Sequence, residues 1–130
     1  MKNILVVVGL FFSTFLVADE VLYCVPEIKI GFTYENNSFV ESRFEKDRFT
    51  VKVDGDFERI NDGTWEMLCS GVGTVRICVD KNGIGKTFKY NKYNGRYLSS
   101  YTSRFGYLDY PSNDGKYDSD SLQAGKWRVF

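Results

Sequence analysis

Short stretches in which apolar and polar residues alternate recur along the chain. The clearest is FTVKV, where Phe49, Val51 and Val53 would share one face and Thr50 and Lys52 the other, the period of a half-buried strand. Further candidate strands are residues 21–32, 38–44, 65–69, 74–80, 86–92, 96–101 and 126–130. Turn signals rich in Asn, Asp and Gly separate them at fairly even intervals. The pattern predicts an all-β domain, a small antiparallel β-barrel or sandwich of about 7–8 strands.

Two Asn-Gly pairs, at residues 82–83 and 94–95, predict the register of three neighbouring strands. If each pair forms a two-residue turn, Ile77 faces Phe88 across the first hairpin and Phe88 faces Tyr101 across the second. The predicted shared face, taken as the core side, carries Val75, Ile77, Val79, Phe88, Tyr90, Tyr97 and Tyr101. The same register places Tyr93 on the outer face, beside the second turn.

The tyrosines at 90, 93, 97 and 101 also follow a helical spacing, so a helix is the competing interpretation. The Asn-Gly pairs and the β-branched run before them favour strands. A core with several phenols needs partners for their hydroxyl groups. We expect these hydroxyls to reach the barrel rim and bulk water, with a tyrosine-lined ligand cavity as the alternative.

The first 18 residues have the layout of an export signal, with Lys2 before an apolar run that ends near Ala18. The run is shorter than a membrane-spanning helix requires. We therefore expect a signal peptide over residues 1–18 and a single β domain over 19–130, located in the periplasm or secreted, with no stable membrane span after cleavage. Leu16 stands where a smaller residue is usual, which leaves an uncleaved anchor as the alternative.

Composition narrows the possible functions. Basic and acidic residues balance at 17 each and form no basic stripe, which argues against nucleic acid as a partner. The chain has no histidine, which removes the commonest general base and most zinc sites. We therefore expect no enzyme activity, no cofactor and no metal.

Three cysteines allow one disulfide and one free thiol. Cys69 and Cys78 flank a glycine-containing turn, and we predict that they are bonded. The register above places Cys78 outside while Trp65, Met67 and Cys69 form an apolar stripe. A bulge would reconcile the two; otherwise Cys24 becomes a rival partner. A free Cys24 is expected to be a small buried hydrophobe, because no histidine can activate it.

Four features of the chain occur together: YC followed by GF (residues 23–24 and 31–32), RFTVKVD, the run from Ile77 to Asn91, and a closing GKWxxF. In these features the chain resembles a group of small exported bacterial β proteins of unassigned function. The resemblance implies a compact exported β domain and no catalytic residue. In that group a cysteine usually stands at the position of Trp127, which would supply a partner for Cys24.

Acidic residues cluster in residues 54–62 and 114–120. Neither segment has the spacing of oxygen ligands and glycine that a calcium-binding loop requires. Asp54 and Glu66 are the pair considered for carboxylate-based hydrolysis, although their separation cannot be judged from sequence.

The function that we predict is a non-catalytic binding or interaction module, inhibitor-like or envelope-associated, with an unknown protein partner. Aromatic residues and Arg are enriched at interfaces, and the candidate binding surface consists of Tyr93, Arg96, Tyr107, Tyr110 and Tyr117. A carrier of a small apolar or aromatic ligand is the alternative, followed by a carboxylate-based hydrolase and an assembly role through the leftover thiol.

Overall fold

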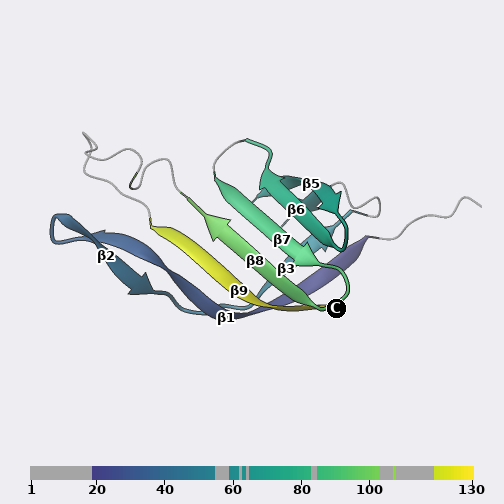
Figure 1. The fold of residues 1–130 in the computed structure, drawn as a ribbon, viewed down its shortest axis with the longest axis horizontal. Helices are drawn as coiled ribbons and strands as arrows, with labels where there is room; N and C mark the ends of the chain where they lie inside the picture. Colours follow the sequence, from purple (N-terminus) through teal and green to yellow (C-terminus); the bar gives the residue numbers. More distant parts are fainter. Residues whose placement is uncertain are drawn as a thin grey trace, which may run out of the picture.

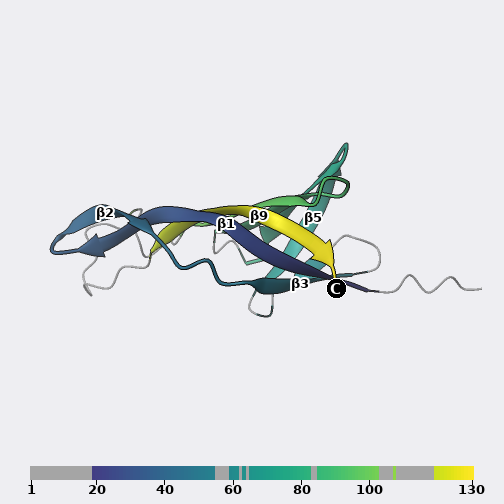
Figure 2. The same cartoon turned by 90° about the horizontal axis from the view of Figure 1, so that it is seen from below.

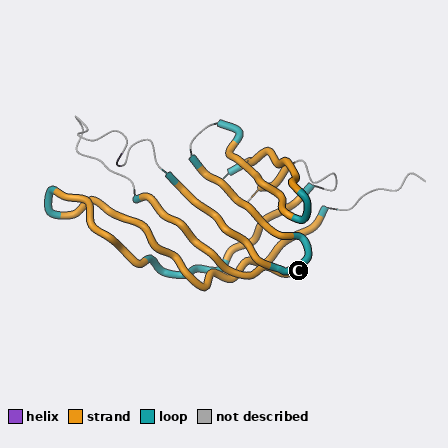
Figure 3. Tube along the Cα trace, viewed as in Figure 1, coloured by secondary structure: helices purple, strands orange, loops and turns teal. Residues whose placement is uncertain are grey.

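The computed structural model describes residues 19–54, 59–61, 63, 65–82, 85–102, 107 and 119–130. Within them the chain forms nine strands: β1 (Glu20–Glu35), β2 (Ser38–Arg43), β3 (Phe49–Val53), β4 (Arg59–Asn61), β5 (Glu66–Val72), β6 (Val75–Asp80), β7 (Lys86–Asn91), β8 (Arg96–Tyr101) and β9 (Asp120–Val129). The tube trace is strand over nearly all of these residues (Figure 3). The helical interpretation of the tyrosine segment is therefore wrong.

The strands form a closed antiparallel barrel. β1, β3, β4, β5, β6, β7, β8 and β9 pair in that order, and β9 pairs back with β1 to complete the ring. β2 lies outside the ring and pairs with the second half of β1. In Figures 1 and 2 this β1–β2 hairpin projects from the barrel, on the side away from β5. The predicted fold class is confirmed, with the barrel form rather than the sandwich.

Alternating apolar residues fill the barrel interior. Val51 and Val53 are buried while Thr50 and Lys52 are exposed, as the alternation in FTVKV predicts. The buried apolar residues are Leu22, Cys24, Val51, Val53, Ile60, Met67, Cys78, Phe88, Tyr90 and Tyr97. Each large side chain removed from water in this way contributes about 1.5–3 kcal/mol, so these side chains supply much of the barrel's stability.

Three of the predicted core aromatics pack together. The rings of Phe88 and Tyr97 are stacked with centroids 5.4 Å apart, and Tyr90 lies 5.7 Å from Phe88. Tyr101 is half-buried and lies 5.9 Å from Trp65. The prediction that these tyrosines are structural is confirmed.

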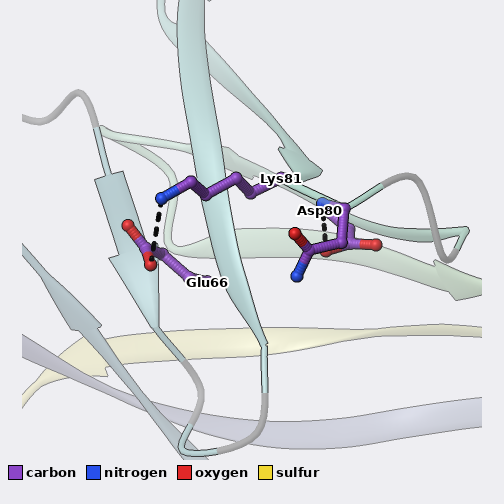
Figure 4. Close-up of polar contacts among 4 residues, drawn as sticks. Glu66, Asp80 and Lys81 are labelled. Atoms are coloured by element: carbon purple, nitrogen blue, oxygen red, sulfur yellow. Dashed lines mark hydrogen bonds and ion pairs between the residues drawn. The ribbon is translucent and has the colours of Figure 1, made fainter.

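The predicted register between β6 and β7 is wrong by one residue. Cys78, not Ile77, faces Phe88, and the connection runs from Lys81 to Gly85 instead of being a two-residue turn. Asp80 accepts the backbone N–H of Asn82 at 3.0 Å, and Lys81 forms an ion pair with Glu66 at 3.8 Å (Figure 4). A one-residue change reverses the faces of a strand. Cys78 and Asp80 are therefore buried, whereas Val79 is 49% exposed.

The register predicted from the second Asn-Gly pair is wrong by two residues. The inward and outward faces of β7 and β8 therefore remain as predicted. Phe88 faces Ser99 rather than Tyr101. The side chain of Asn91 accepts the N–H groups of Tyr93 and Asn94, so the turn begins earlier than the Asn-Gly pair suggests. Tyr93 is 82% exposed, as expected.

Two strands differ from expectation in extent. β9 was expected only over residues 126–130 but begins at Asp120. Gly125 allows β9 to lie close to β1, because a Cβ there would collide with the Val25 carbonyl and the Tyr97 ring. The short β4 had no detectable alternation and was not expected.

Candidate functional site

A bulge in β1 changes which of its side chains point to solvent. Pro26 pairs with Gly125 but Ile28 pairs with Ala124, so Glu27 is an extra residue in β1. Before the bulge, even-numbered residues such as Leu22 and Cys24 point inward. After it, even-numbered residues point outward, because an inserted residue shifts the alternation by one. Ile28 and Ile30 are consequently 55% and 42% exposed.

Ile30 and Phe32, which follow the bulge, line a groove of about 790 Å³ across the outer faces of β2, β1, β9 and β8. Ile30 and Leu122 are cross-strand neighbours and form an apolar floor with Phe32. Glu41 faces Phe32, and Arg43 faces Ile30, from β2. The complete lining is Ile30, Gly31, Phe32, Glu41, Ser42, Arg43, Ser100, Thr102, Asp120, Ser121 and Leu122.

An aromatic cluster continues the groove along the β1–β2 hairpin. The ring centroid of Phe39 lies 6.0 Å from Phe32, 5.1 Å from Tyr34 and 5.2 Å from Tyr107, with edge-to-face geometry in each case. Tyr107 also contacts Phe32 at 5.8 Å and is 60% exposed. The cluster and the groove together form one extended aromatic and apolar surface.

The groove edge formed by β2 carries both signs of charge. Glu41 and Arg43 are exposed, and neither has an ion-pair or hydrogen-bond partner within the described part of the chain. Asp120, at the far side of the groove, is buried. Arrangements of an apolar centre with a polar rim are typical of interaction sites.

A second cleft, of about 480 Å³, brings together the two carboxylates considered for hydrolysis. Asp54 and Glu66 both line it, together with Lys52 and Asn61. Lys52 forms an ion pair with Asp19 at 3.0 Å, and Lys81 lies 3.8 Å from Glu66. The hydrogen bond to Asp19 raises the pKa of Lys52, with smaller contributions from the charges of Asp19 and Asp54. Lysines thus lie beside both acids, and the cleft resembles a solvated ion-pair network.

The structure separates the residues of the predicted binding surface. Tyr93 and Arg96 lie at the β7–β8 turn, next to the C-terminal end of β9, where Trp127 donates its N–H to the Gly95 carbonyl. Tyr107 lies against Phe32 at the other end of β9. Tyr110 and Tyr117 lie outside the described residues. The structure therefore does not bring Tyr93 and Arg96 together with Tyr107.

The cysteines pair as predicted. Cys69 and Cys78 face each other on β5 and β6 and form a disulfide, with Cα atoms 4.0 Å apart. Because Cys78 points inward, the conflict with the apolar stripe of β5 disappears without a bulge. Cys24 is the free cysteine and is fully buried, and this burial raises the pKa of its thiol to about 12. A thiol in this state is a structural side chain rather than a nucleophile.

The core tyrosines differ from expectation at their hydroxyl groups. The oxygens of Tyr90 and Tyr97 are shielded from solvent and do not reach bulk water. Burial raises the pKa of both phenols, and the nearby Arg76 charge partly offsets the effect at Tyr90. No hydrogen-bond partner for the Tyr97 hydroxyl is found among the described residues.

Comparison with known families finds no family model that matches this chain, and no curated protein is similar to it in sequence. No helix in the described part of the chain has the length and apolar character needed to cross a membrane. The described residues contain no group of three or more His, Cys, Asp or Glu side chains placed to hold a metal ion.

Sequence reasoning missed the groove. Ile28, Ile30 and Phe32 continue the inward alternation of Leu22 and Cys24. Pro26 was the available local signal, because proline within a sheet is confined to edge strands, strand starts and bulges. Only the pairing of β1 with β9, about 100 residues away in the sequence, reveals the reversal.

Proposed function

We propose that this protein is an exported, non-catalytic binding module that holds an extended segment of a partner protein in the groove between β2 and β8. The observation that carries the proposal is the apolar floor of Ile30, Phe32 and Leu122, which the β1 bulge turns toward solvent. Surfaces of this kind on small domains are commonly interaction sites.

The chemistry of the groove favours a protein segment. Edge-to-face aromatic rings at Phe39 and Tyr107 extend the apolar floor, and aromatic side chains are frequent binding hot spots. A matching segment would place an apolar side chain on this floor, inside the polar rim of the groove.

Export is supported by the leader-like sequence over residues 1–18 and by the Cys69–Cys78 disulfide, since disulfides persist in oxidising compartments. The lack of histidine and the buried Cys24 thiol support a non-catalytic role.

The test compares two leucines of similar exposure on different walls of the barrel. Leu122 lies in the groove and is 42% exposed, whereas Leu68 on β5 is 44% exposed and lies outside it. A photocrosslinking residue at each position in turn, in the native host, would identify proteins that contact the groove specifically. With the purified partner, Leu122→Asp should weaken binding at least about tenfold, because it places an unpaired charge on the apolar floor. Leu68→Asp should leave affinity unchanged. Equal crosslinking at both positions, or equal affinities of both variants, would overturn the proposal.

A small apolar or aromatic ligand in the same groove is the second candidate. The groove volume of about 790 Å³ lies within the range of small-molecule sites. Native mass spectrometry of protein purified from its own host tests this: a retained molecule that Leu122→Asp loses and Leu68→Asp keeps would favour the carrier.

A further inference from the structure

The outer edge of β2 is a second feature that the proposed function does not use. In the described part of the chain β2 pairs only with β1, while each of the eight barrel strands pairs with a strand on both sides. An edge strand exposes a row of backbone N–H and C=O groups that can pair with another strand.

The pairing with β1 defines which groups point to this edge. Phe44 donates its N–H to the Lys29 carbonyl at 3.0 Å, so residues 44, 42 and 40 face β1. Since hydrogen-bonding direction alternates along an antiparallel strand, the backbone groups of Glu41 and Arg43 face away from β1. The hairpin projects from the barrel (Figures 1 and 2), and no described strand pairs with this edge.

We infer that β2 pairs antiparallel with β2 of a second copy of this chain, with Glu41 of each copy opposite Arg43 of the other. The two-fold axis of this arrangement is perpendicular to the sheet and passes midway between the Ser42 residues of the two copies. Both Glu41–Arg43 pairs are then narrow pairs that exchange two backbone hydrogen bonds.

The charges of Glu41 and Arg43 favour this register over the register shifted by two residues. A shift that places Glu41 opposite Glu41 satisfies the backbone equally well but sets like charges against each other, which is destabilising. In the register proposed, each copy supplies the charge that the other lacks, and neither Glu41 nor Arg43 has a partner within the described residues of its own chain.

The symmetry has a consequence for the groove. Glu41 and Arg43 line the same face of the sheet as Ile30 and Leu122. A two-fold axis perpendicular to the sheet keeps both grooves on one face, so the dimer presents them side by side. The contact is small for a protein interface, and a weak, concentration-dependent dimer is expected.

A charge-swap series measured by sedimentation equilibrium tests the inference. Glu41→Arg and Arg43→Glu each replace two attractive pairs by two repulsive ones, and each should weaken dimerisation at least about tenfold. The double variant E41R/R43E restores opposite charges and should dimerise within about threefold of the unchanged protein. Lys89→Glu, an exposed site on β7, alters net charge as Arg43→Glu does and should have no effect.

A backbone variant completes the test. Glu41→Pro removes an N–H that faces the outer edge and leaves the β1–β2 bonds intact, so it should abolish dimerisation while the circular dichroism spectrum stays unchanged. A monomer at all concentrations up to about 500 µM would overturn the inference. So would a double variant no better than the single ones, or normal dimerisation of Glu41→Pro. Binding of a different protein to this edge by a chain that stays monomeric would overturn it as well.

Discussion

Cys24 lies directly opposite Trp127 where β1 pairs with β9, and both side chains contact the barrel core. The N–H of Trp127 points the other way, to the Gly95 carbonyl at 2.7 Å, so Cys24 and Trp127 form a pair without mutual backbone hydrogen bonds. Cys69 and Cys78 occupy the same kind of pair, because Lys81 donates its N–H to the Glu66 carbonyl three positions along the ladder and the two kinds of pair alternate. A cysteine in place of Trp127 would therefore meet Cys24 in the geometry of the existing disulfide.

We expect Trp127→Cys to form a second disulfide with Cys24. Close Cβ approach at such pairs suits the reach of a disulfide. The oxidised variant should show no free thiol in denaturant, whereas the unchanged protein shows one. The substitution also removes the Trp127 hydrogen bond to Asn91 and its contact with Tyr90, so thiol count is the measurement rather than stability.

Arg128→Cys is the matched control. Residue 128 is exposed and faces Tyr23, so its thiol points away from Cys24. Two free thiols are expected there. A single free thiol or more in oxidised Trp127→Cys would contradict the pairing of β1 with β9 described above.

Stability should fall with rising pH above about 9 because of Cys24. Burial raises its thiol pKa from 9.0 to about 12, so between these values the unfolded chain loses a proton that the native chain retains. The native state is then the one that binds more protons, and the free energy of unfolding decreases by about 1.4 kcal/mol per pH unit. Tyr90 and Tyr97, whose pKa values are also raised, add a decrease of the same sign at higher pH.

Urea unfolding at pH 7.5, 9 and 10 measures this effect. Cys24→Ala should be less stable at pH 7.5 but lose less stability between pH 9 and 10, because alanine does not titrate. Parallel pH curves for the two proteins would show that the thiol does not contribute.

Tyr97→Phe should leave stability unchanged or raise it by up to about 1 kcal/mol. The Tyr97 hydroxyl is buried without a described hydrogen-bond partner, and desolvating such a group is costly. Tyr97→Ala removes the ring that contacts Phe88 and Phe49 and should cost about 3–5 kcal/mol. A large loss in Tyr97→Phe, measured by urea unfolding, would reveal a partner for this oxygen.

The fold could be predicted from sequence because its signals are local. Alternation at Phe49, Val51 and Val53 and regular turn residues are sufficient to indicate small antiparallel strands. The disulfide followed from short spacing and the turn between Cys69 and Cys78. Closure of the ring depends on contacts between β1 and β9, which no local pattern contains.

The two register errors show that a shift by an odd number of residues reverses the faces of a strand, whereas a shift by an even number does not. Side chains of Asp80 and Asn91 accept backbone N–H groups in the two turns and so change where each turn begins. At Asn91 the shift was two residues, and Tyr97 remained in the core. At Asp80 the shift was one residue, and Val79 came out to solvent while Cys78 went in. The apolar stripe that ends at Cys69 was the available clue, because its disulfide partner must share its face.

The extra residue at Glu27 divides β1 into two segments under different selective constraints. Residues before it are held by the barrel interior, so substitutions there change stability first. Those just beyond it still pair with β9, and from Thr33 onward the strand extends past β9 as an arm whose tip at Asn36 and Asn37 can vary in length or sequence without repacking the interior. A single insertion thus makes the arm an exchangeable module, through which new binding specificities could evolve on an unchanged barrel.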